Sequence, residues 1–244
     1  MTASNVYPTA ELQALDSAHY LHPFTDFGAL AKEGSRVMVK GDGVWLTDSD
    51  GNRYLDGMAG LWCTNVGHGR AEIAEAAHEQ MLELAYYNSF FKTSNAPAIR
   101  LADKLASIAP AHIERVFFCG SGSEANDTVF RMVRHYWAIQ GKPEKSHFIS
   151  RRNGYHGSTV AASSLGGMKP MHGQGGLIPG ISHIAQPYWF GEGGDMSPAE
   201  FGLWAARELE REIERIGEEN VAAFIAEPIQ GAGGGIIPPE TYWP

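Results

Sequence analysis

Blocks of apolar and polar residues along the chain predict strands that are followed by helices. Residues 116–118 are an unbroken run of β-forming apolar side chains, which Gly120 and Gly122 interrupt. From Glu124 the apolar spacing becomes helical, and the predicted apolar face carries Ala125, Val129, Met132, Val133 and Tyr136. Ser121 with Glu124 three residues later fits a capping box. This stretch therefore predicts a strand, a glycine loop and a helix.

The second half of the chain repeats this order of elements. Strands are predicted at 147–150, 181–185 and 221–226, and helices at 158–165 and 197–216. The last helix has a strong start signal at Ser197-Pro198-Ala199-Glu200 and a stop at Gly217. The strands are apolar without alternation, which is typical of a mainly parallel sheet covered on both faces. The predicted fold class is α/β.

The first half begins with a predicted arm, residues 1–36, that contains one helix at 11–19. Three β-rich runs follow at 37–40, 44–47 and 53–55, and their turns are rich in glycine and aspartate, which predicts an antiparallel meander. The acidic turn lacks the alternating oxygen ligands of a calcium loop, so a plain turn is expected. Helices are predicted at 71–85 and 97–108.

Charge and composition narrow the class of protein. The formal net charge of −9 argues against a nucleic acid or an anionic membrane as the main partner. No apolar run of transmembrane length and no signal peptide is present, so a cytoplasmic location is expected. Cys63 and Cys119 are far apart in sequence, which predicts two buried packing residues rather than a disulfide or a zinc site. No metal site is predicted.

The helix start after residue 120 is a candidate phosphate site, because free N–H groups and the helix dipole attract anions there. Gly120, Gly122 and Ala125 also satisfy the dinucleotide fingerprint, although the next strand ends in Arg151 instead of an acidic residue. A nicotinamide dinucleotide phosphate, with its 2′-phosphate on Arg151, therefore remains an alternative. A strand-to-helix turn that binds nothing is a further alternative.

Ligands of open parallel sheets bind at the carboxyl ends of the strands. The residues that the predicted strands place there are Ser121, Gly122, Ser123, Tyr155, His156 and Glu227. Together they offer a phosphate cradle, a ring that can stack, an imidazole and a carboxylate. This set favours a phosphorylated planar heteroaromatic cofactor. Each member alone has a structural alternative, such as a loop anchor for Tyr155-His156 or a helix-end partner for Glu227.

Several motifs along the chain resemble those of class III aminotransferases, and within that class the pyruvate-dependent ω-amine and β-alanine transaminases. They are the segments at 50–57, 61–63, 65–69, 90–93, 120–126, 153–157, 227–228 and 237–244. The resemblance covers almost the whole chain. It implies pyridoxal 5′-phosphate on a fold type I scaffold, in a homodimer whose active sites lie at the interface.

The resemblance also implies roles for individual residues. Ser121, Gly122 and Ser123 would hold the cofactor phosphate, Tyr155 would stack on the pyridine ring, and Glu227 would support the hydrogen bonds around it. His156 is assigned to the same cofactor-binding set. Substrate-binding residues would be Phe24, Leu61, Trp62, Phe90, Phe91 and Tyr155. The implied reaction moves an amino group from an amine or ω-amino acid to a keto acid, with pyruvate as the expected acceptor.

The resemblance further implies that residues 1–65 are an arm and meander within a small domain, and that residues 66–244 belong to an incomplete large domain. In the family the Schiff-base lysine and the aspartate that pairs with the pyridinium nitrogen follow the segment that contains Glu227. Here the last lysine is Lys169, in a loop that has a non-catalytic role in the family. No catalytic residue is therefore assigned, and these residues alone are expected to be inactive and poorly folded. A truncated, non-catalytic fragment that only binds the phosphate is the alternative.

Overall fold

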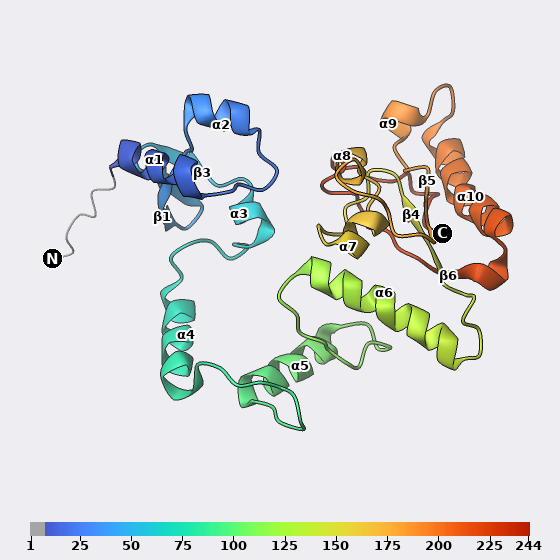
Figure 1. The fold of residues 1–244 in the computed structure, drawn as a ribbon, viewed down its shortest axis with the longest axis horizontal. Coiled ribbons are helices and arrows are strands. Elements are labelled where there is room, and N and C mark those ends of the chain that lie inside the picture. Colours follow the sequence, from blue (N-terminus) through green and yellow to red (C-terminus); the bar gives the residue numbers. More distant parts are fainter. Residues whose placement is uncertain (1–7) are drawn as a thin grey trace. The chain divides into compact units, whose positions relative to one another are not determined.

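The computed structural model describes residues 8–244, and the chain divides into two compact units, Met1–Ala111 and His112–Pro244 (Figure 1). Each unit contains one three-stranded sheet. The domain boundary near residue 65 remains a prediction.

The first unit contains the predicted antiparallel meander. Its strands are β1 (Met38–Asp42), β2 (Trp45–Asp48) and β3 (Arg53–Leu55), paired in the order β1-β2-β3. Asp48 stabilises the turn between β2 and β3. Its carboxylate accepts hydrogen bonds from the backbone of Asp50 and Asn52, the Asn52 amide and the Tyr54 hydroxyl at 2.8–3.1 Å. The acidic turn is thus satisfied by donors of the chain itself.

The helices of the first unit are α1 (Thr9–His19), α2 (Phe27–Glu33), α3 (Ala59–Trp62), α4 (Ala71–Leu84) and α5 (Ala96–Ile108). The predictions for α1, α4 and α5 are confirmed within two residues at each end. Two helices were not predicted. α2 has only seven residues, too few for a clear period, although its Asp26 cap accepts the backbone N–H groups of Gly28 and Ala29.

The second unit contains the predicted parallel sheet. Its strands are β4 (His147–Arg151), β5 (Ile181–Ile184) and β6 (Val221–Phe224), in the order β5-β4-β6. Both pairings are parallel, with Ile149 opposite Ser182 on one side and Phe224 on the other. The carboxyl ends of the three strands therefore lie along one edge of the sheet.

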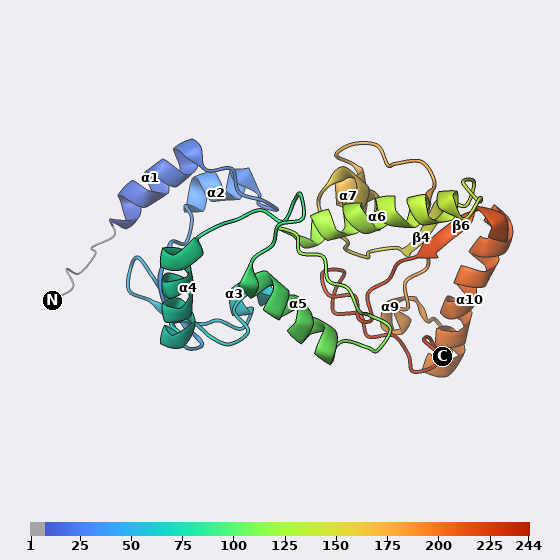
Figure 2. The same ribbon diagram turned by 90° about the horizontal axis from the view of Figure 1, so that it is seen from below.

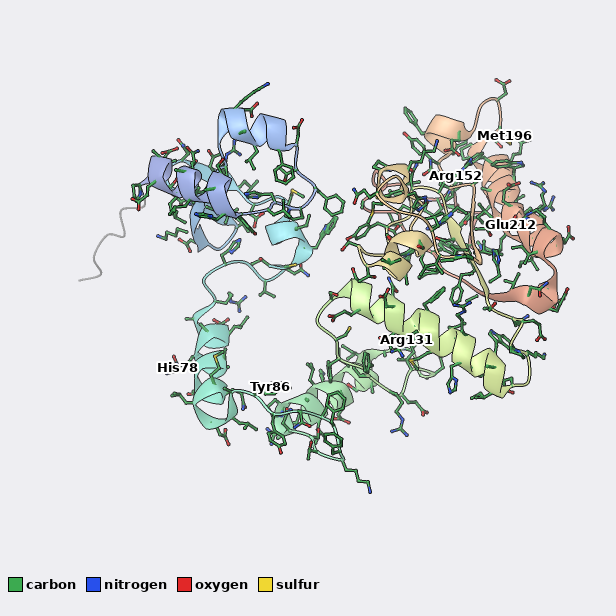
Figure 3. All side chains as sticks on the ribbon, viewed as in Figure 1. His78, Tyr86, Arg131, Arg152, Met196 and Glu212 are labelled. Carbon is green, nitrogen blue, oxygen red and sulfur yellow. The ribbon has the colours of Figure 1, made fainter. Side chains whose placement is uncertain are left out.

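Helices cover this sheet on both sides. They are α6 (Gly122–Ile139), α7 (Val160–Leu165), α8 (Lys169–His172), α9 (Trp189–Glu192), α10 (Pro198–Ile216) and the 3-10 turn Glu218–Asn220. Figures 1 and 2 show α6 and α10 on opposite sides of the strands. On the α6 side, Phe130, Phe148 and Leu165 form a buried cluster, and the Phe130 and Phe148 rings are 4.5 Å apart at their centroids. On α10, Phe201 and Ala205 pack with Tyr242, close to Met196, which lies between α9 and α10 (Figure 3).

The strand predicted at 116–118 is not formed. Within the described residues no backbone hydrogen bond joins this segment to another strand, and Phe117 is 69% exposed. A parallel strand depends on a hydrogen-bonded neighbour, and β6 is paired only with β4. The prediction of a strand is therefore wrong here. An apolar run forms a strand only where a neighbouring strand can pair with it.

The predicted apolar face of α6 is buried only in part, and the predicted burial of both cysteines is wrong. On α6 the core contacts come from Phe130 and Val133, while Val129, Met132 and Tyr136 are exposed. The apolar stripe of this helix is wider than the sheet surface that it covers in the second unit. Both cysteines are exposed as well, since they lie in loop or turn segments that carry no core contacts. Among residues 8–244, none of the helices combines the length and the apolar character that a bilayer crossing requires.

Candidate functional site

The first turn of α6 leaves two backbone donors open. Ser121 is the N-cap, and its Oγ accepts the N–H of Glu124 at 3.2 Å. The Glu124 carboxylate accepts the N–H of Gly120 at 2.7 Å, one residue earlier than a regular capping box would have it. Among the described residues, the N–H groups of Gly122 and Ser123 have no acceptor. These two donors lie at the positive end of an 18-residue helix.

Space is available in front of these donors. Gly122 is exposed, and a Cβ atom added to it would meet no heavy atom within 4 Å, so the helix start is not covered by other parts of the second unit on that side. Ser121 is exposed next to it. Two N–H donors, an adjacent hydroxyl and an open approach fit the oxygen atoms of a phosphate group.

The loop at 153–159, which follows β4, is fastened to the same end of α6. Ser123 Oγ accepts the N–H of Ser158 at 3.0 Å, and the amide of Asn126 donates to the carbonyl of His156 at 2.6 Å. Gly157 has a φ of 126°, and a Cβ there would come within 2.5 Å of Ser123 Oγ. The loop therefore runs in close contact with the helix, which requires glycine at this position.

Tyr155 lies on this loop and is held from the other side by Glu227. One carboxylate oxygen of Glu227 accepts the N–H of Tyr155 at 2.9 Å, and the other accepts the N–H of Gly231 at 2.8 Å. The Tyr155 ring is half-buried. The structure thus brings together all six residues of the predicted cofactor-binding set around the start of α6, and gives Glu227 the direct task of positioning the Tyr155 backbone.

His156 is buried beneath this loop. Burial lowers the pKa of its imidazole below the usual value of 6.5, and the nearby Glu227 carboxylate opposes that shift. A lowered pKa makes His156 neutral at pH 7. It therefore adds no positive charge to the site at that pH.

Arg151 does not lie where a dinucleotide would need it. Its side chain is 1% exposed, donates from Nη2 to the carbonyl of Glu227, and places its guanidinium 5.5–5.6 Å from the ring centroids of Tyr242 and Trp243. A 2′-phosphate cannot reach it. The alternative of a nicotinamide dinucleotide phosphate loses its main support.

Three residues hold this site in place in roles that were not predicted from the sequence. Asn126 and Asp127 on α6 contact the Tyr155 loop, and the buried Arg151 fixes the backbone of Glu227. A signal for the first two was available. Asn126 and Asp127 are consecutive polar residues in the first turns of a helix that covers a sheet, where apolar residues are expected.

The residues predicted to bind substrate lie in the first unit, except for Tyr155. The five are exposed, and four of them have positive φ: Phe24 (49°), Leu61 (64°), Trp62 (64°) and Phe91 (57°). Bulky side chains rarely adopt this conformation. Such strained residues cluster at functional sites, which is consistent with the predicted role.

Leu61 and Trp62 belong to α3, which is a left-handed turn. Its four residues Ala59–Trp62 have φ between 48° and 64°. The turn is closed by hydrogen bonds from the N–H of Trp62 to the carbonyl of Met58 (2.8 Å) and from the N–H of Cys63 to that of Ala59 (2.9 Å). For L-residues this conformation costs about 1–2 kcal/mol each relative to a right-handed turn.

Lys169 lies in a separate polar pocket of about 440 Å³. Its lining also includes Arg152, His172, His183 and Glu192, and none of the six predicted cofactor-binding residues. Figure 3 labels Arg152 at the end of β4. No group of three or more histidine, cysteine, aspartate or glutamate side chains within residues 8–244 is arranged to hold a metal ion.

A parallel sheet with an open helix start, a tyrosine and a carboxylate at its strand ends agrees with the fold of pyridoxal-phosphate-dependent transferases of fold type I, which the similar solved structures support. The sequence profile of the class III aminotransferases matches residues 29–244. The chain belongs to the class III aminotransferases, a family that depends on pyridoxal 5′-phosphate.

Curated relatives agree with this assignment. A putrescine–pyruvate aminotransferase from Pseudomonas aeruginosa is 63% identical over 237 residues, which are 97% of this chain and 52% of the relative. A diaminobutyrate–2-oxoglutarate transaminase from Halomonas elongata is 42% identical over 212 residues, 85% of this chain and 45% of the relative. The chain therefore spans about half the length of these relatives.

Solved structures show the same relation. An (S)-enantioselective ω-transaminase from Thermomicrobium roseum superimposes with a TM-score of 0.94 at 45% identity, over 98% of this chain and 53% of that one. The ω-transaminase from Pseudomonas jessenii, solved in complex with PMP, gives a TM-score of 0.92 at 41% identity, over 95% and 52%. The predictions of family, fold type and cofactor class are confirmed.

Proposed function

We propose that these residues form the phosphate-holding part of a transaminase that moves an amino group from an amine or ω-amino acid to pyruvate or another keto acid. The observation that carries the proposal is the pair of open N–H groups at Gly122 and Ser123, next to a tyrosine that Glu227 holds in place. Membership of the class III aminotransferases supports it.

Each residue of the site has a physical task in this proposal. Gly122 and Ser123 donate backbone hydrogen bonds to the cofactor phosphate, with Ser121 beside them. Tyr155 covers one face of the pyridine ring, and neutral His156 adds a ring without adding a charge that would compete for the phosphate. The cofactor itself, when bound, supplies the electron sink that makes the amino-group exchange possible.

The proposed donor is an amine and the proposed acceptor is pyruvate. The 63% identical relative is named for putrescine and pyruvate, which favours a short aliphatic diamine as the donor. Phe24, Leu61, Trp62, Phe90, Phe91 and Tyr155 are proposed to line the substrate side of the site. A homodimer is proposed as the active assembly.

None of the seven lysines is proposed to link covalently to the cofactor. They are Lys32, Lys40, Lys92, Lys104, Lys142, Lys145 and Lys169. Lys169 lies in a pocket that contains no member of the predicted cofactor-binding set. These 244 residues by themselves are therefore expected to bind the cofactor reversibly and not to transaminate. The second candidate function, a non-catalytic fragment that binds the cofactor, rests on the same observation.

An absorbance titration with pyridoxal 5′-phosphate, before and after borohydride, tests this proposal. We expect reversible binding, weaker binding of pyridoxal without the phosphate, and no cofactor mass on any lysine peptide after reduction. Stable attachment to Lys169 would contradict the assignment of the lysines. No binding by the folded chain would contradict the proposed site.

A glycine substitution makes the titration specific to the cradle. Gly122→Val adds a branched side chain next to the N–H groups at a position where the new Cβ meets no heavy atom within 4 Å, so we expect the fold to be retained and the phosphate to be crowded. We expect at least a tenfold loss of affinity, about 1.4 kcal/mol. Gly175→Val is the matched control, because a Cβ at Gly175 also meets no neighbour and lies in another loop. Equal affinities for both variants would contradict the phosphate cradle.

A further inference from the structure

A further cluster of hydrogen bonds lies on the second turn of α6, one turn after the residues proposed to bind the phosphate. One carboxylate oxygen of Asp127 accepts a hydrogen bond from the hydroxyl of Thr159 at 2.6 Å and another from the N–H of Ala162 at 3.2 Å. Thr159 is the N-cap of α7, and its Oγ also accepts the N–H of Ala162 at 3.3 Å. Asp127 thus links α6 to the exact residue at which the Tyr155 loop ends and α7 begins.

The loop that carries Tyr155 is fastened at both ends, and Asp127 holds one of them. At its start, Glu227 accepts the N–H of Tyr155. Further along, Asn126 and Ser123 hold His156 and Ser158. Ser123, Asn126 and Asp127 are thus three side chains of α6 that hold the loop. Of these, Asp127 accepts hydrogen bonds from two groups that follow Gly157, the Thr159 hydroxyl and the Ala162 N–H.

We propose that Asp127 is a positioning residue that sets the placement of the Tyr155 ring relative to the phosphate-binding start of α6. This inference rests on the proposed function and deepens it. The cofactor phosphate and the ring are joined by a short CH2–O linkage that limits their separation, so the affinity depends on the spacing of the two contacts as well as on each contact. A side chain that ties the loop to the helix fixes that spacing without touching the ligand.

The proposal predicts that loss of Asp127 weakens the binding of one ligand and leaves that of another unchanged. Asp127→Ala removes the link, so we expect about a tenfold weaker binding of pyridoxal 5′-phosphate, whose two ends need the fixed spacing. Binding of inorganic phosphate, measured as competition, is expected to stay within twofold because the N–H groups of Gly122 and Ser123 are unchanged. A general loss of structure would weaken both ligands, and such a result would overturn the proposal.

Conservative variants serve as internal controls. Asp127→Asn keeps an oxygen acceptor for Thr159 and Ala162, so we expect it to restore most of the affinity. Thr159→Ser keeps the hydroxyl donor and is expected to bind like the original chain, whereas Thr159→Val is expected to resemble Asp127→Ala. Asp103→Ala makes the same chemical change at an exposed position of α5 and is expected to leave both affinities unchanged.

A double-mutant cycle with Tyr155→Ala identifies the target of the positioning. If Asp127 acts through Tyr155, its removal has no further effect once the ring is absent, and the two losses are not additive. Additive losses would overturn the proposal.

A second readout needs no cofactor. Amide hydrogen exchange of the peptide that contains residues 153–162 should become faster in Asp127→Ala and remain unchanged in Asp127→Asn and Asp103→Ala. Unchanged exchange in Asp127→Ala would overturn the link itself.

Failure of this inference is distinguishable from failure of the proposed function. If the original chain does not bind pyridoxal 5′-phosphate, the proposed function fails, and the positioning role with it. If the original chain binds and Asp127→Ala binds equally well, the function stands and only the role of Asp127 is overturned.

Discussion

Ala59 shows how a single backbone conformation can oppose the preference of its residue. It begins the left-handed turn Ala59–Trp62 with a φ of 48°, a conformation that glycine adopts readily and alanine does not. A strain of this kind persists only where surrounding contacts fix the turn, and here the turn presents Leu61 and Trp62. Strain at this turn is the expected cost of displaying two large side chains on one short segment.

Replacing Ala59 by glycine should stabilise the first unit. Glycine relieves about 1–2 kcal/mol of backbone strain in the folded state. It also increases the entropy of the unfolded chain, which costs about 0.4–1 kcal/mol of stability, so the free energy of unfolding should rise by about 0.5–1 kcal/mol. Urea denaturation of the chain measures the change. Ala76→Gly, on the exposed face of the right-handed helix α4, is the matched control and should lower stability by about 0.5–1 kcal/mol. A loss of stability in Ala59→Gly would show that the turn is not strained.

At the same scale, the sequence predicted the groups that face a ligand better than the groups that hold them. Ser121, Gly122 and Tyr155 follow from local rules on helix starts and strand ends. Asp127 and Arg151 act through partners that are 32 and 76 residues away in sequence. Local periodicity carries no information on such partners, so their roles became visible only in the folded chain.

Among the elements, α10 has the most complete local start signal. Ser197 Oγ accepts the N–H of Glu200 at 3.3 Å, and the Glu200 carboxylate accepts the N–H of Ser197 at 2.9 Å, so the predicted capping box is confirmed. The Ser197 hydroxyl also donates to the Glu200 carboxylate at 2.6 Å, and this hydrogen bond, together with the one from the Ser197 N–H, lowers the pKa of Glu200 below its usual value. The helix places Phe201 and Ala205 in the core, which makes its first turn important for the second unit.

Removing the N-cap side chain of α10 should lower stability more than the removal of another exposed side chain would. Ser197→Ala leaves the N–H of Glu200 without its acceptor, and we expect about 1 kcal/mol less stability in urea denaturation. Ser107→Ala is the control, because Ser107 is also exposed but donates to a carbonyl within the last turn of α5. Equal effects of the two variants would mean that the cap does not stabilise α10.

The elements that sequence alone predicted well are those whose cause is local. α5, α6 and α10 have caps and apolar periods of their own. The predicted bounds of α5 and α10 and the predicted start of α6 agree with the structure within two residues. Residues 116–118 are as apolar as β6 but form no strand, because a strand also requires a neighbour. The short turns α8 and α9, four residues each, are below the length at which a period can be recognised.

For the second unit as a whole, three histidines couple folding to pH. Burial lowers the pKa of His147, His156 and His183 below the usual value of 6.5. The pKa of His183 is lowered further by His172, whose ring centroid lies 5.1 Å from that of His183. As the pH falls below 6.5, the unfolded chain binds protons that the folded unit does not bind, and the free energy of unfolding decreases.

The second unit should therefore lose stability between pH 7.5 and pH 5.5. Urea denaturation at both pH values, followed by tryptophan fluorescence, measures this loss. His183→Gln should reduce the pH dependence because it removes one of the three groups. His135→Gln, at an exposed position on α6, should leave the pH dependence unchanged. Stability that is constant or rises towards pH 5.5 would contradict the burial of these histidines in a neutral form.

The free edge of β6 has a consequence for how these residues behave in solution. Within the described residues β6 pairs only with β4, and the apolar segment 116–118 is also without a strand partner. Open edges and bare apolar segments promote aggregation and are what chaperones and proteases encounter first on a new polypeptide. In solution these residues are therefore expected to associate with one another through that edge, at a rate that rises with their concentration.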